Sequence, residues 1–321
     1  MKLFEHPDFK DAISASESHF ANTGLTAQLI EKDYYVTEVL RLVALQYPNR
    51  VIFKGGTSLS KGWKLINRFS EDIDLFLNRD EFDPPLSNKG VDTTLKSIEQ
   101  SILNQNLNLI KLTNLSKWSR GSSRNSYFEY PTNFSGNIAI PNRVLLEMGI
   151  RSGSYPVEKI KLSSYLAEFL QNTDHSLGAE DETSFEMSLL HFCRTFVEKL
   201  FTIHSKVEEY KNKSSPIQNS ARHYYDIFCL AQQPAVKMML ESSDYQKIKE
   251  DCDKISRMYF SGSYYEPDNL SFSKSDALFP STDLRIVIAT EYDKQCSTLC
   301  YETYPTWEEV ELCFQELKEL L

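Results

Sequence analysis

The chain has 321 residues, a net charge of −10 and a hydrophobic fraction of 41%, values typical of a globular protein with two domains or one large one. No apolar run approaches the ~20 residues that cross a bilayer, and the first residues lack the apolar core of a signal peptide, so we expect a cytoplasmic protein with no membrane partner. The acidic balance does not favour a nucleic-acid partner, although local patches decide such contacts.

The first quarter of the chain predicts a helical segment followed by a strand, a turn, a short helix and a second strand. Apolar residues at helical spacing predict helix over residues 8–47. A short strand is expected at Val51–Lys54, a turn at Gly55–Ser58 and a helix at Leu59–Asn67. Asp72–Leu77 alternates between polar and apolar residues like a strand.

The middle of the chain predicts one helix and then antiparallel strands. Residues 91–110 carry apolar residues at helical spacing. Residues 111–153 resemble a β-meander with candidate strands at Tyr127–Tyr130, Gly136–Ile140 and Val144–Ile150.

The last half of the chain is predominantly helical in pattern from Pro156 onward. We therefore expect an α+β protein with a domain boundary near 155–165. Residues 1–160 would form a mixed sheet flanked by helices, and residues 161–321 a mainly helical domain that completes an active-site cleft.

Asp72 and Asp74 form an Asp-x-Asp pair within the second predicted strand. Residues two apart in a strand point to the same face, so Ile73 would face the core and both carboxylates would project together. Two such anions repel unless a cation lies between them, and Mg²⁺ prefers oxygen ligands that it shares with substrate phosphates. The alternative is an edge strand with two solvated acids.

The turn at Gly55–Ser58 precedes this pair at short spacing. Its glycines allow close approach of the backbone to a phosphate, and backbone N–H groups at a helix start attract anions. A plain strand-to-helix turn with Ser58 as N-cap is the alternative. Farther along, Glu147 is an isolated acid in the apolar stretch 144–150, where it either faces the surface or joins Asp72 and Asp74 around two Mg²⁺ ions.

Three charged positions on predicted helices admit both structural and functional interpretations. Lys199 borders an apolar stripe, so its ammonium either reaches water or meets an anion such as a phosphate. Asp226 follows Arg222 by four residues and either pairs with it or serves the site. The charged stretch Glu31–Asp33 either braces the site or forms a solvated helix face, and the solvated face is favoured.

Two sequence motifs resemble the AbiEii family of abortive-infection toxins, which belongs to the DNA polymerase β nucleotidyltransferase superfamily. They are Lys54–Leu59 (KGGTSL) and Arg68–Leu75 (RFSEDIDL). Ile30–Val36 resembles the family's N-terminal motif, and Val197–Leu200 and Arg222–Ile227 resemble two later ones. The resemblance covers most of the chain and is weak after about residue 235.

The resemblance implies a polymerase-β-like nucleotidyltransferase domain and specific roles. Asp72 and Asp74 would be catalytic and bind Mg²⁺, with Glu147 as a third acid. Lys199 and Asp226 match later family positions and would also be catalytic. The residues that would hold the nucleotide are Gly55, Gly56, Thr57, Ser58 and Lys199. The implied function is a toxin that transfers NMP from an NTP to an RNA acceptor, foremost the 3′ end of tRNA, with an antitoxin encoded nearby.

The acceptor can also be sought in basic residues that alternate with aromatic residues. This pattern suits single-stranded nucleic acid, while a polar hairpin packed by aromatic side chains is the alternative. The residues are Lys111, Lys117, Trp118, Arg120, Arg124, Tyr127, Phe128 and Tyr130. Two further hypotheses remain open: NMP transfer to a protein side chain, and a non-catalytic nucleotide-binding regulatory protein.

Overall fold

The computed structural model divides into two compact units, which we call the sheet unit and the helical unit. It describes residues 1–70, 72–105, 107–134 and 141–321. The sheet unit comprises Met1–Trp63 and Ser70–Leu190, and the helical unit comprises Lys64–Phe69 and His191–Leu321. The short segment 64–69 thus interrupts the sheet unit in sequence and belongs to the other one.

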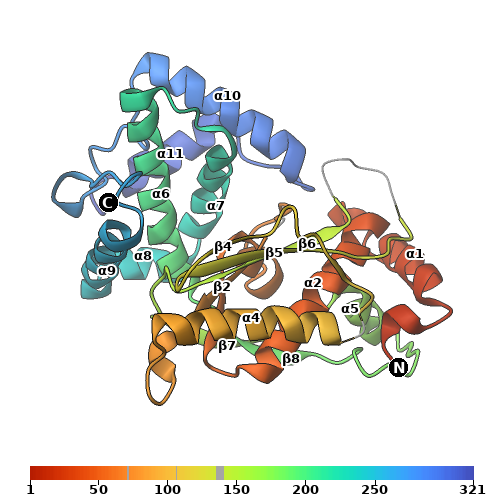
Figure 1. The fold of residues 1–321 in the computed structure, drawn as a ribbon. Helices are drawn as coiled ribbons and strands as arrows, with labels where there is room; N and C mark the ends of the chain where they lie inside the picture. Colours follow the sequence, from red (N-terminus) through yellow and green to blue (C-terminus); the bar gives the residue numbers. More distant parts are fainter. Residues whose placement is uncertain (71, 106, 135–140) are drawn as a thin grey trace. The chain divides into compact units, whose positions relative to one another are not determined.

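The sheet unit contains an eight-stranded mixed sheet in its described residues, in the order β3-β5-β6-β2-β1-β8-β7, with β4 also paired to β5 (Figure 1). β2 pairs with β6 and β1 with β8 in parallel, and the other pairs are antiparallel. The strands are β1 (Val51–Lys54), β2 (Asp72–Leu77), β3 (Ile110–Lys111), β4 (Lys117–Ser119), β5 (Ser123–Glu129), β6 (Arg143–Gly149), β7 (Val157–Leu162) and β8 (Phe185–Leu190).

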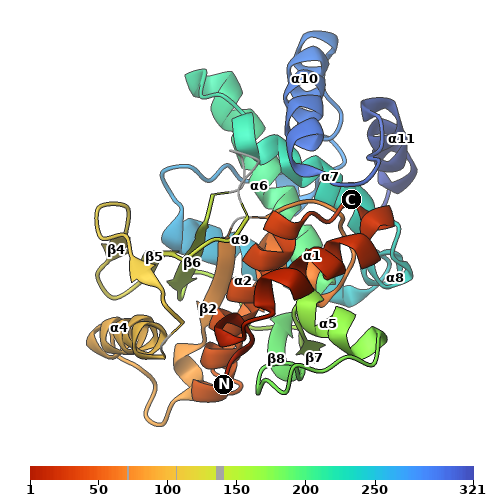
Figure 2. The ribbon, with the colours of Figure 1, turned by 90° about the vertical axis from the view of Figure 1, so that its right-hand side faces the viewer.

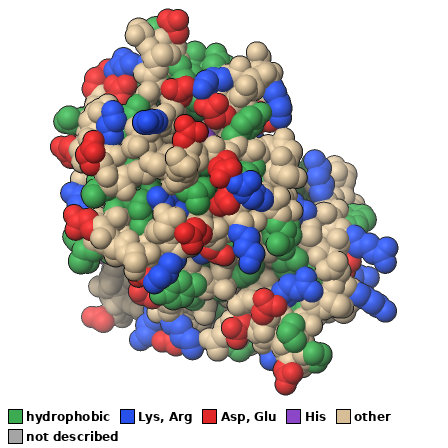
Figure 3. All heavy atoms as spheres, turned by 90° about the vertical axis from the view of Figure 1, so that its left-hand side faces the viewer, with side chains coloured by type: hydrophobic (Ala, Val, Ile, Leu, Met, Phe, Trp, Pro, Cys, Tyr) green, Lys and Arg blue, Asp and Glu red, His purple; other side chains and the backbone are tan. Residues whose placement is uncertain are grey.

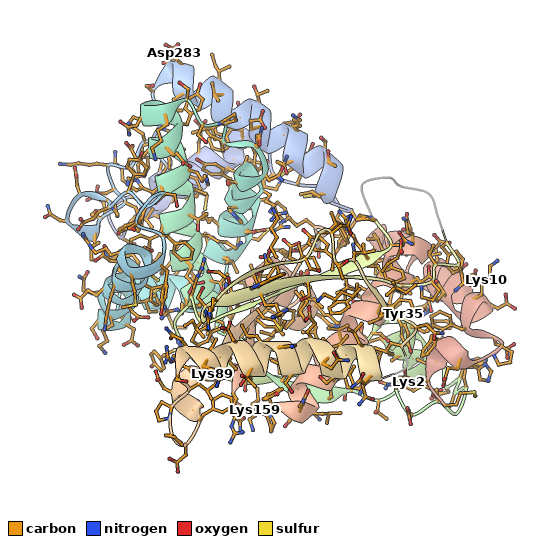
Figure 4. The ribbon with its side chains drawn as sticks, viewed as in Figure 1. Lys2, Lys10, Tyr35, Lys89, Lys159 and Asp283 are labelled. Atoms are coloured by element: carbon orange, nitrogen blue, oxygen red, sulfur yellow. The ribbon has the colours of Figure 1, made fainter. Side chains whose placement is uncertain are left out.

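Helices α2 and α4 pack on one face of this sheet. On that face Tyr35 of α2 stacks on Tyr130 at the end of β5, and Glu99 of α4 accepts a hydrogen bond from Ser126. Figure 4 shows Tyr35 among the side chains of the sheet unit, and Figure 2 shows α1 and α5 beside α2. The helices of this unit are α1 (Phe9–His19), α2 (Ala27–Gln46), α3 (Gly55–Thr57), α4 (Asn88–Asn104) and α5 (Tyr165–Asn172), with a π-helical turn at Ser58–Gly62.

The helical unit is built from α6 to α11 and includes segment 64–69. Phe69 N donates to Leu299 O at the end of α10, and Arg68 forms an isolated β-bridge with Cys300. The helices are α6 (Phe192–Lys213), α7 (Arg222–Ala231), α8 (Pro234–Leu240), α9 (Ser243–Tyr259), α10 (Thr282–Leu299) and α11 (Trp307–Leu317). Within the residues that the model describes, no helix is long and apolar enough to span a bilayer.

The α+β class expected from the sequence is confirmed, although some elements differ from the prediction. Strands β7 and β8 extend the sheet beyond Pro156, where helices were expected, so the units divide after Leu190 rather than near residue 160. β7 was missed because its outward positions are charged, and β8 because a short apolar run fits either a strand or a buried helix. The helix predicted at Leu59–Asn67 ends at Gly62, and the following segment 64–69 belongs to the helical unit. The predicted strand Gly136–Ile140 lies outside the described residues.

Candidate active site

A row of polar side chains crosses five neighbouring strands of the sheet unit. Lys54, Asp74, Glu147, Asn125 and Lys117 are successive Cα partners on β1, β2, β6, β5 and β4. Laterally paired residues project from the same face of a sheet. The sheet therefore brings both acids together between two lysines, although they are far apart in sequence.

The opposite face of these strands explains the local fold. Ile73 and Leu146 are Cα partners and fully buried, as expected from the alternation of β2 and β6. Asp72 lies two residues before Asp74 and shares its face, so the predicted orientation of the Asp-x-Asp pair is confirmed. Glu147 lies on this face too, beside Asp74.

The surroundings of Glu147 disfavour the ionised form of its carboxyl group. Burial first, and then the neighbouring Asp74 and Asp72, raise the pKa of Glu147 to about 7, while Lys54 acts in the opposite direction. Asn125 donates a hydrogen bond from Nδ2 to Oε1 of Glu147 at 2.6 Å. Three carboxyl groups thus lie on one face of neighbouring strands, and their repulsion adds to burial in disfavouring the ionised form of Glu147.

The Gly55 turn fits closely against Asp74. Gly55 has φ +76°, and a Cβ atom there would lie 2.0 Å from Asp74 Oδ2. The Thr57 hydroxyl donates to the backbone carbonyl of Asp72, and the buried Ser58 hydroxyl donates to Gly55 O at 2.9 Å. Both hydroxyls are therefore engaged inside the turn, which braces the start of β2.

The charged stretch Glu31–Asp33 is a structural brace, so the favoured interpretation as a solvated face is wrong. Glu31 and Lys32 are buried, because each side chain meets partners elsewhere in the sheet unit. Asp33 accepts a hydrogen bond from Lys61 Nζ at 2.6 Å, and Lys61 also donates to Ser163 O. This ion pair ties α2 to the turn that follows Gly55.

The helical unit contains a compact cluster of ion pairs around Asp226, which is fully buried. Arg68 binds it through two hydrogen bonds, Nε to Oδ1 at 2.6 Å and Nη2 to Oδ2 at 2.7 Å. Lys199 Nζ lies 2.7 Å from Asp226 Oδ2 and 3.1 Å from Nδ1 of His223. The predicted residues Lys199 and Asp226 are therefore in direct contact.

The charges of this cluster stabilise the ionised carboxylate. Burial alone would raise the pKa of Asp226, but Arg68 and Lys199 outweigh it and hold the pKa well below its usual range. Burial lowers the pKa of Lys199 in spite of Asp226, and burial together with Lys199 lowers the pKa of His223 to about 3. Arg68 and Lys199 thus bring two positive charges to one buried carboxylate.

Sequence reasoning missed two residues of these regions. Arg68 was quoted within a motif but was given no role, although a buried acid requires a cation from somewhere in the chain. Asn125 carried no signal, because only the register of β5 against β6 places it beside Glu147.

We call Asp72, Asp74 and Glu147 the acidic row. These three acids suit a cation that substrate phosphates also help to bind. Among residues 1–70, 72–105, 107–134 and 141–321, no group of three or more His, Cys, Asp or Glu side chains is arranged to hold a metal ion by itself. Mg²⁺ in nucleotide enzymes is commonly bound by one or two carboxylates plus substrate phosphates. Asp72 and Asp74 fit that pattern, and both carboxylates add to burial in raising the pKa of the neighbouring Glu147. A metal ligand role for Glu147 stays a prediction.

A family model described as "Nucleotidyl transferase AbiEii toxin, Type IV TA system" matches residues 39–292. This match includes the Gly55 turn, the acidic row, Lys199 and Asp226. The chain belongs to the AbiEii nucleotidyltransferase toxin family. Membership implies an NTP substrate and a cognate antitoxin.

Two solved structures resemble the chain at low sequence identity. MenT4, a nucleotidyltransferase toxin from Mycobacterium tuberculosis H37Rv, is 14% identical with a TM-score of 0.49, over 97% of this chain and 95% of that one. A candidate nucleotidyltransferase from H. pylori is 16% identical with a TM-score of 0.41, over 85% of this chain and 98% of that one. A search of the curated proteins gave no match.

Proposed function

We propose that this AbiEii toxin transfers NMP from an NTP to the 3′ end of an RNA, with tRNA as the foremost acceptor, in a reaction that depends on Mg²⁺. The observation that supports this most strongly is the acidic row, in which Asp72, Asp74 and Glu147 share one face of the sheet. A cluster of this charge is costly in a protein unless a cation binds there.

Asp72 and Asp74 would hold Mg²⁺ together with the phosphates of the nucleotide, and Glu147 would be the third acid. When bound, the ion neutralises charge on the transferring phosphoryl group and on the leaving group. The Gly55–Ser58 turn packs directly against Asp74, because Gly55 has no Cβ atom. From there it would place backbone groups beside the triphosphate.

In the proposed reaction, a hydroxyl oxygen of the acceptor attacks the α-phosphorus of the NTP. A new P–O bond forms, the bond between the α-phosphorus and the oxygen that bridges to the β-phosphate breaks, and pyrophosphate leaves. The hydroxyl proton passes to a carboxylate of the acidic row. Pre-positioned charge supplies most of the catalysis in such phosphoryl transfers.

Lys199 and Asp226 have different proposed roles. Lys199 would meet an anion in addition to Asp226, because Arg68 already makes two hydrogen bonds to that carboxylate. Asp226 is fully buried and bound by two cations, so it would act by holding Lys199 and Arg68 in position.

The test uses purified protein, each of the four NTPs labelled on the α-phosphate, Mg²⁺ and total tRNA, with EDTA and Asp72→Asn as controls. Label on RNA that requires Mg²⁺ and Asp72 is the expected result. Label on protein would instead support a protein side chain as acceptor. Absence of transfer with all four NTPs would contradict both forms of the proposal.

A further inference from the structure

The basic and aromatic residues of 111–130 separate onto the two faces of the sheet. Lys111 and Arg124 lie on the face covered by α4, where both pair with Glu99 at 2.7 and 2.9 Å. Phe128 and Tyr130 are buried in the core. These four residues stabilise the fold and are not available to a polynucleotide.

A different group remains on the face that carries the acidic row. Lys117 is exposed, and it is the Cα partner of Asn125 on the neighbouring strand. Tyr127 is the Cα partner of Leu145, which in turn partners Asp72, so Tyr127 lies in the next row two strands from that acid. The Arg143 guanidinium lies 5.2 Å from the centre of the Tyr127 ring. We call Lys117, Tyr127 and Arg143 the Tyr127 platform.

The position of this platform suits an acceptor strand. Two strand spacings put Tyr127 about 10 Å from Asp72 across the sheet. On the face of the molecule shown in Figure 3, Lys and Arg side chains lie among Asp and Glu side chains. Because the chain has a net charge of −10, contact with nucleic acid depends on a local basic group. Two cations and a partly exposed aromatic ring match the phosphates and bases of an unpaired strand.

We propose that the Tyr127 platform binds the single-stranded 3′ end of the acceptor RNA. This inference rests on the proposed function. A terminal base stacks on the Tyr127–Arg143 pair, Lys117 contacts a backbone phosphate, and the 3′ hydroxyl then points along the sheet toward the acidic row. The platform would thereby favour acceptors with an unpaired 3′ end over fully paired ends.

The test measures fluorescence anisotropy of a 5′-labelled RNA hairpin with a four-nucleotide single-stranded 3′ overhang, as a function of salt. Tyr127→Leu should weaken binding about tenfold with little change in salt dependence, since it removes stacking alone. Lys117→Glu should weaken binding about tenfold and reduce the salt slope by about one, as expected for a lost phosphate contact.

Two matched controls lie elsewhere on the sheet unit. Lys96→Glu makes the same charge change at an exposed position of α4, and Trp118→Leu removes an exposed ring beside Arg124 on the other face. Both should change affinity less than twofold. Far-UV circular dichroism and thermal melting establish that each variant is folded, and the exposed position of Lys117 keeps that variant informative if Tyr127→Leu unfolds.

The outcomes separate this inference from the proposed function. Wild-type affinity in both platform variants, or losses in Trp118→Leu instead, would overturn the platform while leaving nucleotide transfer untouched. Loss of RNA binding in the platform variants of a protein that transfers no nucleotide would retain the platform and refute the transfer. Absence of binding by the wild type would refute the platform.

Discussion

The acidic row of the sheet unit and the Asp226 cluster of the helical unit have opposite electrostatic environments. Asp72, Asp74 and Glu147 gather like charges on one face, and burial together with the two aspartates raises the pKa of Glu147. Asp226 is surrounded by opposite charges that hold its pKa low. The carboxylates of the first region repel one another and therefore favour the binding of a cation. Asp226 is instead neutralised by Arg68 and Lys199 of the protein itself. Removing an acid should therefore impair chemistry in the first region and folding in the second.

The largest effect is expected from Asp226→Asn. This change leaves Arg68 and Lys199 buried without their counter-charge, so the free energy of unfolding should fall by about 3–5 kcal/mol. Urea denaturation measures the loss. Lys247→Gln, which touches an exposed ion pair with Asp244, is the matched control and should cost less than about 0.5 kcal/mol. A loss of the same small size in Asp226→Asn would remove the distinction between the two regions.

Asp72→Asn should reduce nucleotide transfer by about a hundredfold or more, because it removes a charge that we propose holds Mg²⁺ together with the nucleotide phosphates. Its free energy of unfolding should fall far less than that of Asp226→Asn, since Asp72 and Glu147 repel each other and Thr57 binds the backbone carbonyl of residue 72. Steady-state transfer assays and urea denaturation on the same preparation check both halves. Retained transfer would refute the role of Asp72 in metal binding.

Gly55→Ala tests the close contact between the Gly55 turn and Asp74 of the acidic row. A methyl group would meet Asp74 Oδ2, and the backbone has a positive φ that alanine adopts at a cost of about 1–2 kcal/mol. We expect a loss of stability of about 2 kcal/mol and at least about a tenfold loss of transfer, because Asp74 has to move. Gly178→Ala is a suitable control, since its φ is also positive and no atom lies within 4 Å of the added group. Equal effects on transfer in both variants would indicate strain alone.

The pH dependence of stability should have opposite signs in the two regions. Glu147 has a folded pKa above its usual value of 4.5, so its contribution is present at low pH and is lost as pH rises through about 7. Asp226 has a depressed pKa, so its contribution is present above the usual 3.8 and is lost only as pH falls. In Mg²⁺-free buffer, Glu147→Gln should therefore gain about 1–3 kcal/mol relative to wild type between pH 5 and pH 8. Parallel curves for the two proteins would contradict the assignment.

The sequence could predict the parts of these regions that local pattern determines. Alternation placed Asp72 and Asp74 on one face and Ile73 in the core, and motif spacing identified the Gly55 turn. Local pattern could not reveal Asn125 beside Glu147, which depends on strand register. Arg68 beside Asp226 depends on a contact between distant segments. The strands β7 and β8 were missed because short runs of mixed composition do not distinguish strand from helix.

The placement of segment 64–69 has a consequence for synthesis of the toxin. Arg68 and Asp226 are separated by 158 residues, so a nascent chain carries Arg68 long before its partner emerges from the ribosome. A product that stops at Leu190 would contain β1 to β8 and the whole acidic row, but its Arg68 would lack the carboxylate of Asp226. Termination anywhere before residue 199 would thus leave the acidic row in a chain that has neither Lys199 nor Asp226.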